Sequence, residues 1–341
     1  MQTTKENKKE LISELENSQI AKRRFKDFMI NKVGKNKIDR ISECNNFLEL
    51  KESLNKVIKV HRANSCGDRF CPICAKKKAL QNVHDIFPVV KWIFKKHDKR
   101  FIFVTLSSPN VKKEKLEETI KLYNSAFNRL KRFPEFKNIK GYLRKLEITY
   151  NKERDDYNPH FHVIFVVNKT YFTDSRQYIS HERWLDMWQK ATRLYDEIKI
   201  IDVRKIKSLK DDDLLKGVLE VAKYSAKSED YLQNKNTFNA FYSSLRSKQL
   251  IVFGGLFKDG KKKLKEKNDD EFNQFLEVDD EVYYYLYFEK FMNKSEKYKE
   301  KVMNIKTLDE YKELFFELNN REPNLPERKI LKSLIEKKAE K

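Results

Sequence analysis

Two histidines near the middle of the chain, His160 and His162, flank a single phenylalanine and precede an unbroken apolar run. The run is rich in β-branched and aromatic residues, which predicts a buried strand. Because successive side chains of a strand point to opposite faces, the two imidazoles share one face. Two neutral imidazoles side by side can bind a metal ion, and the alternative is that the rings only pack or form hydrogen bonds.

A carboxylate that could complete such a metal site lies on the preceding strand, predicted over residues 142–150. Apolar side chains occupy one side of this segment and polar side chains the other, which indicates a half-exposed strand with Glu147 on its polar face. If the loop that follows closes symmetrically, Glu147 lies opposite His162. Two imidazoles and one carboxylate leave coordination positions open for substrate oxygens, whereas the alternative is an ordinary exposed glutamate.

The cysteines form a second candidate metal site. The chain contains Cys44, Cys66, Cys71 and Cys74. The C-x-x-C pair that ends this set places two thiolates where one tetrahedral Zn²⁺ can bind both, and the other two cysteines complete a four-sulfur shell. A redox pair is the alternative, but such a pair follows a strand and opens a helix, whereas this motif follows a polar turn. We therefore predict a structural zinc ion.

A third group of reactive side chains lies on a helix predicted to begin after the aspartate run at residues 211–213. Glu220, Tyr224 and Lys227 stand at positions i, i+4 and i+7, so they would form one stripe along that helix. In a basic protein with a candidate metal site, the stripe fits a base, a nucleophile and a phosphate-binding cation. The alternative is a tyrosine that only packs at the helix end.

The charge of the chain points to a polyanionic partner. The formal net charge is +21 at pH 7, and residues 261–341 hold 19 basic and 19 acidic side chains, which leaves 54 basic against 33 acidic in residues 1–260. A positive field on the part of the chain that carries the motifs favours nucleic acid, although lysine enrichment can also serve solubility alone. Lys76, Lys77 and Lys78 begin a predicted helix and are candidate DNA contacts, although a solvated lysine run is the commoner meaning of such a triplet.

The sequence offers no membrane anchor. No apolar run reaches the length of a membrane span, and the N-terminus lacks the apolar core of a signal peptide. We therefore expect a cytoplasmic protein with no membrane partner, in a compartment where thiols stay reduced.

The order of these motifs resembles the rolling-circle replication initiator (Rep) proteins of small bacterial plasmids. These form a branch of the HUH endonuclease superfamily with a single tyrosine and an upstream glutamate. The resemblance covers residues 44–258. Its motifs are the cysteine cluster with Arg69 and Pro72, residues 103–106, the metal motif at residues 159–162, the tyrosine motif at residues 224–227 with Glu220 a turn before it, and residues 253–256.

The resemblance implies an α+β fold in which a five-stranded antiparallel sheet with packed helices carries the site. A small zinc-binding module would precede this sheet and a helical tail would follow it. On this plan residues 1–43 form a basic helical arm, residues 44–98 the zinc-binding module and its helix, residues 99–258 the nickase domain and residues 259–341 a charged accessory tail.

The resemblance also implies a mechanism. The ligands of a catalytic Mg²⁺ or Mn²⁺ would be His160, His162 and Glu147. Tyr224 would attack the scissile phosphate and leave a 5′-phosphotyrosine on the protein and a free 3′-OH to prime synthesis. Lys227 would lower the effective pKa of the phenol or steady the phosphate. Glu220 would activate water, or the second strand end, at termination.

The implied partners are the double-strand origin of a plasmid, single-stranded DNA, and the host helicase and replication machinery. A host helicase is implied because the sequence contains no G-x-x-x-x-G-K-[ST] phosphate loop. Two other functions stay open. One is an HUH transposase or mobilisation relaxase, which shares the chemistry. The other is a non-catalytic zinc-containing nucleic-acid-binding protein, in which the histidines and Tyr224 are structural.

Overall fold

The computed structural model describes residues 4–55, 57–206, 212–222, 226–266, 272, 275, 283–292, 295–302 and 307–339. The chain forms two compact units. Met1–Cys74 and Val278–Lys341 together form one, the terminal unit, and Ala75–Glu277 forms the other, the central unit.

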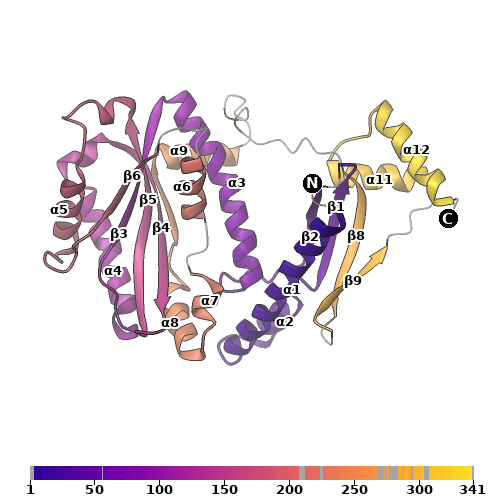
Figure 1. Ribbon diagram of the computed structural model, residues 1–341, viewed down its shortest axis with the longest axis horizontal. Coiled ribbons are helices and arrows are strands. Elements are labelled where there is room, and N and C mark those ends of the chain that lie inside the picture. The colour runs from indigo at the N-terminus through magenta and orange to yellow at the C-terminus, as the bar shows by residue number, and fades with distance from the viewer. Residues whose placement is uncertain are drawn as a thin grey trace. The chain divides into compact units, whose positions relative to one another are not determined.

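The central unit is built on a five-stranded antiparallel sheet in the order β6-β3-β5-β4-β7 (Figure 1). Its strands are β3 (Lys99–Ser107), β4 (Ile139–Asn151), β5 (Asp156–Asn168), β6 (Asp202–Ile206) and β7 (Ile251–Gly255). The apolar run after the two histidines forms β5, which lies at the centre of the sheet and is buried on both faces over residues 163–167. The predicted five-stranded antiparallel sheet of an α+β fold is therefore confirmed.

Helices cover both faces of this sheet (Figure 1). On one face lie α4 (Lys113–Leu130) and α5 (His181–Thr192), and Phe165 of β5 stacks between Phe127 of α4 and Trp184 of α5. On the other face lie α3 (Pro72–Lys96), α6 (Asp212–Ala222) and α9 (Leu256–Glu266), whose apolar residues share one core with β3, β4 and β5. The short elements are η1 (Pro134–Asn138), η2 (Lys169–Phe172), α7 (Ser228–Tyr231) and α8 (Lys235–Leu245).

The hairpin of β4 and β5 differs from the sequence prediction in two respects. The polar face of β4 is not half-exposed, because α6 packs over it: Lys145 is fully buried and Glu147 is 7% exposed. The paired strands also extend to Asn151 and Asp156, so the turn between them is shorter than the sequence prediction assumes. Glu147 therefore lies opposite His160 rather than His162. Because the register differs by two residues, Glu147 stays on the histidine face.

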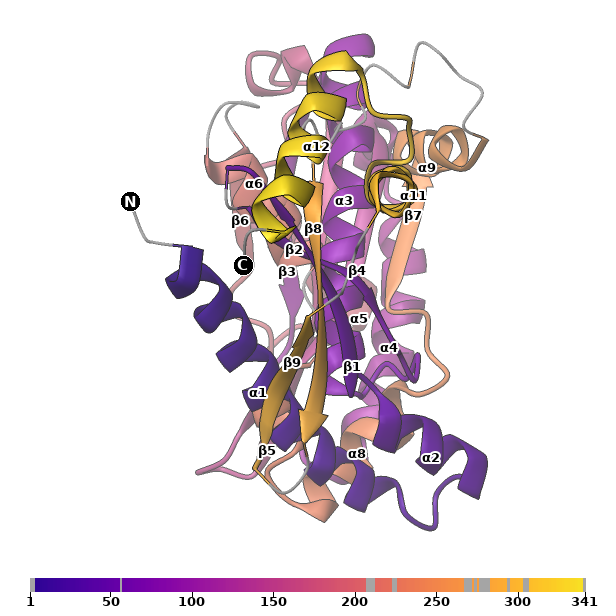
Figure 2. The same ribbon diagram turned by 90° about the vertical axis from the view of Figure 1, so that its right-hand side faces the viewer.

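The terminal unit joins the two ends of the chain in one four-stranded sheet of order β2-β1-β8-β9 (Figure 2). Its strands are β1 (Phe47–Ser53), β2 (Ile58–Ala63), β8 (Tyr283–Met292) and β9 (Lys297–Val302). Its helices are α1 (Thr4–Met29), α2 (Lys35–Glu43), α11 (Leu308–Asn319) and α12 (Leu325–Ala339). The predicted C-terminal helices are present, but the sequence analysis missed β8 and β9. The aromatic side chains of β8 favour a strand, whereas the charged residues around them are typical of an exposed helix.

The core of the terminal unit combines residues from both ends of the chain. Leu48 and Leu50 of β1 lie in one buried cluster with Phe291 of β8 and Tyr298 of β9, and Leu11 and Leu15 of α1 pack against it. The hydroxyl of Tyr298 accepts a hydrogen bond from Gln19 Nε2 (2.8 Å) and donates one to the carbonyl of Asn45 (2.5 Å). Within the parts of the chain described, no helix is both long and apolar enough to cross a bilayer.

We expect a chain that ends at Glu277 to lose the folded terminal unit. Strand β1 would lose its β8 partner and the buried faces of Phe291 and Tyr298, so backbone hydrogen bonds and apolar burial disappear together. Limited proteolysis should then cut within residues 4–63. A chain that ends at Asn320 keeps β8, β9 and α11 and should resist the protease. Equal resistance of both truncated chains would contradict this expectation.

Candidate functional site

The two histidines of β5 and the glutamate of β4 converge on one point. The Nε2 atoms of His160 and His162 are 3.2 Å apart, and His162 Nε2 is 3.5 Å from Glu147 Oε2. One ligand atom from each residue lies within 4.8 Å of the other two. His160 and Glu147 are buried, and the side chain of His162 is 12% exposed. Three potential ligands therefore meet at one largely buried point.

The remaining nitrogen of each imidazole is held by the protein. His160 Nδ1 is 3.0 Å from the carbonyl oxygen of Asn158, so this nitrogen carries the proton and Nε2 carries the lone pair. His162 Nδ1 lies 3.3 Å from the hydroxyl of Thr105 on β3. Outer contacts of this kind orient a histidine that binds a metal through its other nitrogen.

The electrostatics keep both rings neutral near pH 7. Burial lowers the pKa of His160. Burial, followed by the neighbouring His160 ring and the charge of Lys145, lowers the pKa of His162 to about 3. A neutral imidazole offers a lone pair without first losing a proton, so the two rings and Glu147 fit a divalent cation. Such a two-histidine, one-carboxylate set leaves coordination positions free for other oxygens.

One residue of this site, Lys145, was missed by the sequence analysis as a functional residue. Its ammonium group lies 2.9 Å from Glu147 Oε2 and 3.1 Å from the carbonyl oxygen of Glu220. The sequence placed Lys145 on an exposed face, where a lysine calls for no explanation. The available signal was its position two residues before Glu147, because that spacing puts both side chains on the face that carries the histidines.

The structure brings Glu220 into the site but does not place Lys227 on the same helix. The side chain of Glu220 is 36% exposed, and its Oε1 atom is 3.5 Å from His162 Nε2. Helix α6 ends at Ala222, and Lys227 is an exposed residue with extended backbone that precedes α7. The predicted helix through Lys227 is therefore wrong, and acidic residues in the first turn of α7 favour the new helix start. Tyr224 lies outside the described residues.

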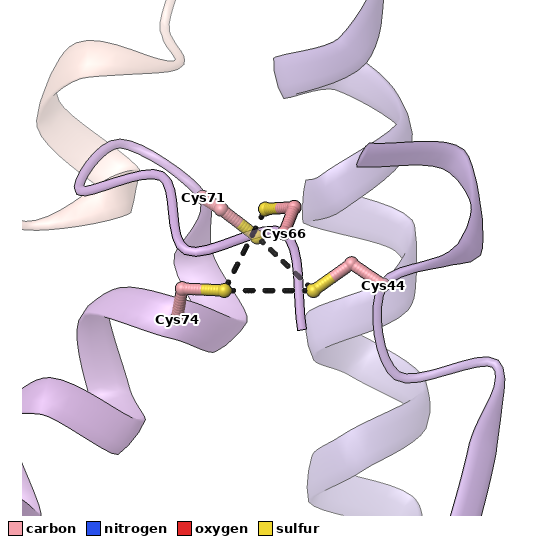
Figure 3. A group of neighbouring side chains, drawn as sticks. All are labelled: Cys44, Cys66, Cys71 and Cys74. Carbon is pink, nitrogen blue, oxygen red and sulfur yellow. Dashed lines mark hydrogen bonds between the residues drawn. The ribbon is translucent and has the colours of Figure 1, made fainter. Parts of the chain in front are cut away.

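The four cysteines form a compact buried cluster in the terminal unit (Figure 3). Cys44 caps the C-terminal end of α2, Cys66 lies in the loop after β2, and Cys71 and Cys74 flank the start of α3. The Sγ atom of Cys44 is 3.5 Å from that of Cys74 and 3.8 Å from that of Cys71, and Cys66 lies 3.6 Å from Cys74. Sulfurs bound to one Zn²⁺ at ~2.3 Å lie about 3.8 Å apart in a tetrahedron. The cluster therefore has the dimensions of a Cys₄ zinc site and not of disulfides.

We expect Cys74→Ser to lose the zinc. Purified wild-type chain should carry about one zinc, and removal of one thiolate from a four-sulfur shell weakens binding and the folding coupled to it. Metal analysis under reducing conditions measures the loss. Ser65→Ala is the matched control, because the Ser65 hydroxyl contacts Cys74 Sγ at 3.2 Å without being one of the four sulfurs. Wild-type chain without zinc, or a Cys74→Ser chain that keeps it, would contradict the assignment.

Two other groups of side chains, a lysine run on α3 and a cluster in the terminal unit, give weaker support for a functional site. Lys77 and Lys78 are exposed on α3 and Lys76 is half-buried, as both interpretations of the lysine run require, so their contact with DNA stays a prediction. In the terminal unit, the side chains of Glu49, His61 and Glu317 also lie close together. Arg62 Nη1, however, is 2.5 Å from Glu317 and 3.8 Å from Glu49. Because this guanidinium already forms ion pairs with both carboxylates, we assign an ion-pair network and no metal to that group.

Comparison with known proteins gives consistent matches. The family model described as "Replication protein" matches residues 57–302. A "Protein rep" of Staphylococcus aureus is 46% identical over 215 residues, which cover 62% of this chain and 91% of that protein. A "Protein rep" of Streptococcus pneumoniae is 32% identical over 236 residues, 68% of this chain and 73% of that protein. A "Protein rep" of Bacillus amyloliquefaciens is 31% identical over 270 residues, 72% of this chain and 79% of that protein. No solved structure matches the chain.

Proposed function

The chain belongs to the replication protein family, and from that membership we propose that it initiates rolling-circle replication of a plasmid by nicking one strand of the double-strand origin. The observation that carries this proposal is the convergence of His160 Nε2, His162 Nε2 and Glu147 Oε2 on one point of the sheet. The net charge of +21 supports a nucleic-acid substrate.

In the proposed mechanism, His160, His162 and Glu147 hold Mg²⁺ or Mn²⁺. When bound, the ion polarises the scissile phosphate and offsets its developing charge. Asn158 and Thr105 keep the two imidazoles oriented. The cover of α6 over this face of the sheet limits the water that reaches the ligands.

The proposed nucleophile is the phenol of Tyr224. Its oxygen forms the new bond to phosphorus as the phenol loses its proton, and the bond from phosphorus to the 3′ oxygen of the DNA breaks. The products are a 5′-phosphotyrosine on the chain and a 3′-OH that primes synthesis. This role is supported by the sequence motif and the family, and by Glu220, four residues earlier in the sequence, whose side chain faces the metal ligand His162.

Two further side chains have proposed roles in strand transfer. Lys227 supplies a cation that steadies the phosphate, and its exposure before α7 leaves it accessible to DNA. Glu220 acts as the base that activates water, or the second strand end, when a round of replication terminates. Its position 3.5 Å from His162 Nε2 supports a role next to the metal ligands. Zinc in the cysteine cluster would be structural, and a host helicase would unwind the duplex.

The test is a nicking assay with purified chain, Mn²⁺ and a supercoiled plasmid that carries the cognate origin. We expect relaxed circles and a protein band shifted by covalent DNA in denaturing gels. A plasmid without the origin is the control, and EDTA should stop the reaction. Cleavage of transposon ends or of a transfer origin instead would favour the related transposase or relaxase. Binding without any covalent adduct would favour the non-catalytic protein.

A further inference from the structure

Lys145 is an unusual residue to find beside a metal site. Its side chain has no exposed surface, and it lies on β4 directly opposite His162. An ammonium group removed from water costs free energy unless the protein supplies counter-charges and hydrogen bonds. The metal-site role of His160, His162 and Glu147 gives no reason for a second cation there.

The partners of Lys145 among the residues described come from two separate elements. Its Nζ atom is 2.9 Å from the Oε2 atom of Glu147, and this is the same oxygen that faces His162 Nε2 at 3.5 Å. Its second partner, 3.1 Å away, is the carbonyl oxygen of Glu220 in the last turn of α6. A lysine near the carbonyls at the C-terminal end of a helix is favourable, because its charge complements the negative end of the helix dipole. Lys145 therefore connects a proposed metal ligand to the end of the helix that precedes Tyr224.

This geometry gives the ammonium two opposing effects on a bound cation. By holding the Glu147 carboxylate in one orientation, it favours the arrangement in which the three ligands converge. By sharing the Glu147 Oε2 atom and adding a positive charge next to a divalent ion, it opposes metal binding. In a buried site the free energy of repulsion between like charges exceeds the entropic gain from fixing one carboxylate in advance. The opposing effect therefore dominates the affinity for the metal ion.

We propose that Lys145 is a positioning residue that competes with the divalent cation for Glu147 and fixes the end of α6 against the metal ligands. This inference rests on the proposed function. It predicts that the natural site binds its metal less tightly than the same site without the lysine charge. It also predicts that the hydrogen bonds of Lys145, rather than its charge, support the rate of nicking.

The experiment compares two substitutions in the full chain. Lys145→Met removes both the charge and the hydrogen bonds, whereas Lys145→Gln removes the charge and keeps an N–H donor. Lys140→Met is the control, because Lys140 is an exposed lysine of the same strand that contacts only the carbonyl of Lys137 among the hydrogen bonds described. Mn²⁺ binding without DNA is measured by electron paramagnetic resonance, and single-turnover nicking is measured at saturating Mn²⁺.

We expect both Lys145 variants to bind Mn²⁺ about tenfold or more tightly than wild type, with Lys140→Met unchanged. At saturating metal, nicking should fall about tenfold or more in Lys145→Met and less in Lys145→Gln, since the second variant retains a donor to Glu220. If Lys145→Met fails to fold, the Lys145→Gln affinity carries the same test. Unchanged or weaker Mn²⁺ binding by the folded variants would overturn the proposal.

Failure of this inference is distinguishable from failure of the proposed function. If the His162→Ala variant binds Mn²⁺ as tightly as the wild-type chain does, the metal site itself is contradicted. Mn²⁺ binding that His162→Ala removes, but that neither Lys145 variant changes, would contradict only the role of Lys145. The cysteine cluster should not contribute to the measured Mn²⁺ binding, because thiolates select Zn²⁺ over Mn²⁺.

Discussion

Replacing His162 by alanine is expected to reduce nicking to background while DNA binding and the fold are retained. His162 Nε2 is the atom that faces both carboxylates of the site, since Glu147 Oε2 and Glu220 Oε1 each lie 3.5 Å from it. Loss of an outer-shell partner of a metal ligand costs about 10–100-fold in affinity or activity, so loss of the ligand itself should cost more than about 100-fold.

The measurement is Mn²⁺-dependent relaxation of origin plasmid, with Mn²⁺ binding followed in parallel. His84→Ala is the matched control, because it removes an imidazole that is 61% exposed on α3 and away from the three ligands. We expect the control to bind Mn²⁺ and nick as wild type does. Nicking by the His162→Ala chain at the wild-type rate, or undiminished wild-type nicking in EDTA, would remove the metal from the mechanism.

Local sequence patterns predicted the parts of this site that depend on neighbouring residues. The period of two in a strand was sufficient to put His160 and His162 on one face. The short loop between the two strands, which sets their register, kept Glu147 on the same face of the preceding strand. The C-x-x-C spacing was sufficient to bring Cys71 and Cys74 together. In each case the relevant geometry spans only a few residues, so tertiary packing had little opportunity to change it.

The features that the sequence did not predict depend on contacts between distant segments. A lysine on the polar side of an alternating strand is expected to be exposed, and only the packing of α6 over β4 makes Lys145 a buried cation. Similarly, β8 pairs with β1 across more than half the chain, and no local period identifies that partner. The end of α6 at Ala222 was missed because Glu220, Tyr224 and Lys227 have helical spacing whether or not the helix continues.

Replacing Tyr224 by phenylalanine is expected to abolish both nicking and the covalent protein–DNA adduct. The substitution removes one oxygen and keeps the aromatic ring, so stability and DNA binding should change little while the proposed attacking atom is lost. Tyr231→Phe is the matched control, because Tyr231 is a buried tyrosine of α7 and its hydroxyl cannot reach a DNA phosphate. The control should nick and form the adduct.

Glu220→Ala separates the two steps that the mechanism assigns to this region. A base for termination is not needed for the first attack, so this variant should still nick and still form the phosphotyrosine. It should then fail to release the completed circle, and a plasmid replication assay should show products longer than one unit. Normal release of the circle by the Glu220→Ala chain would show that Glu220 is not the base for termination. A covalent adduct in the Tyr224→Phe chain would show that another residue is the nucleophile. The pair of variants therefore tests the proposed nucleophile and the proposed base independently.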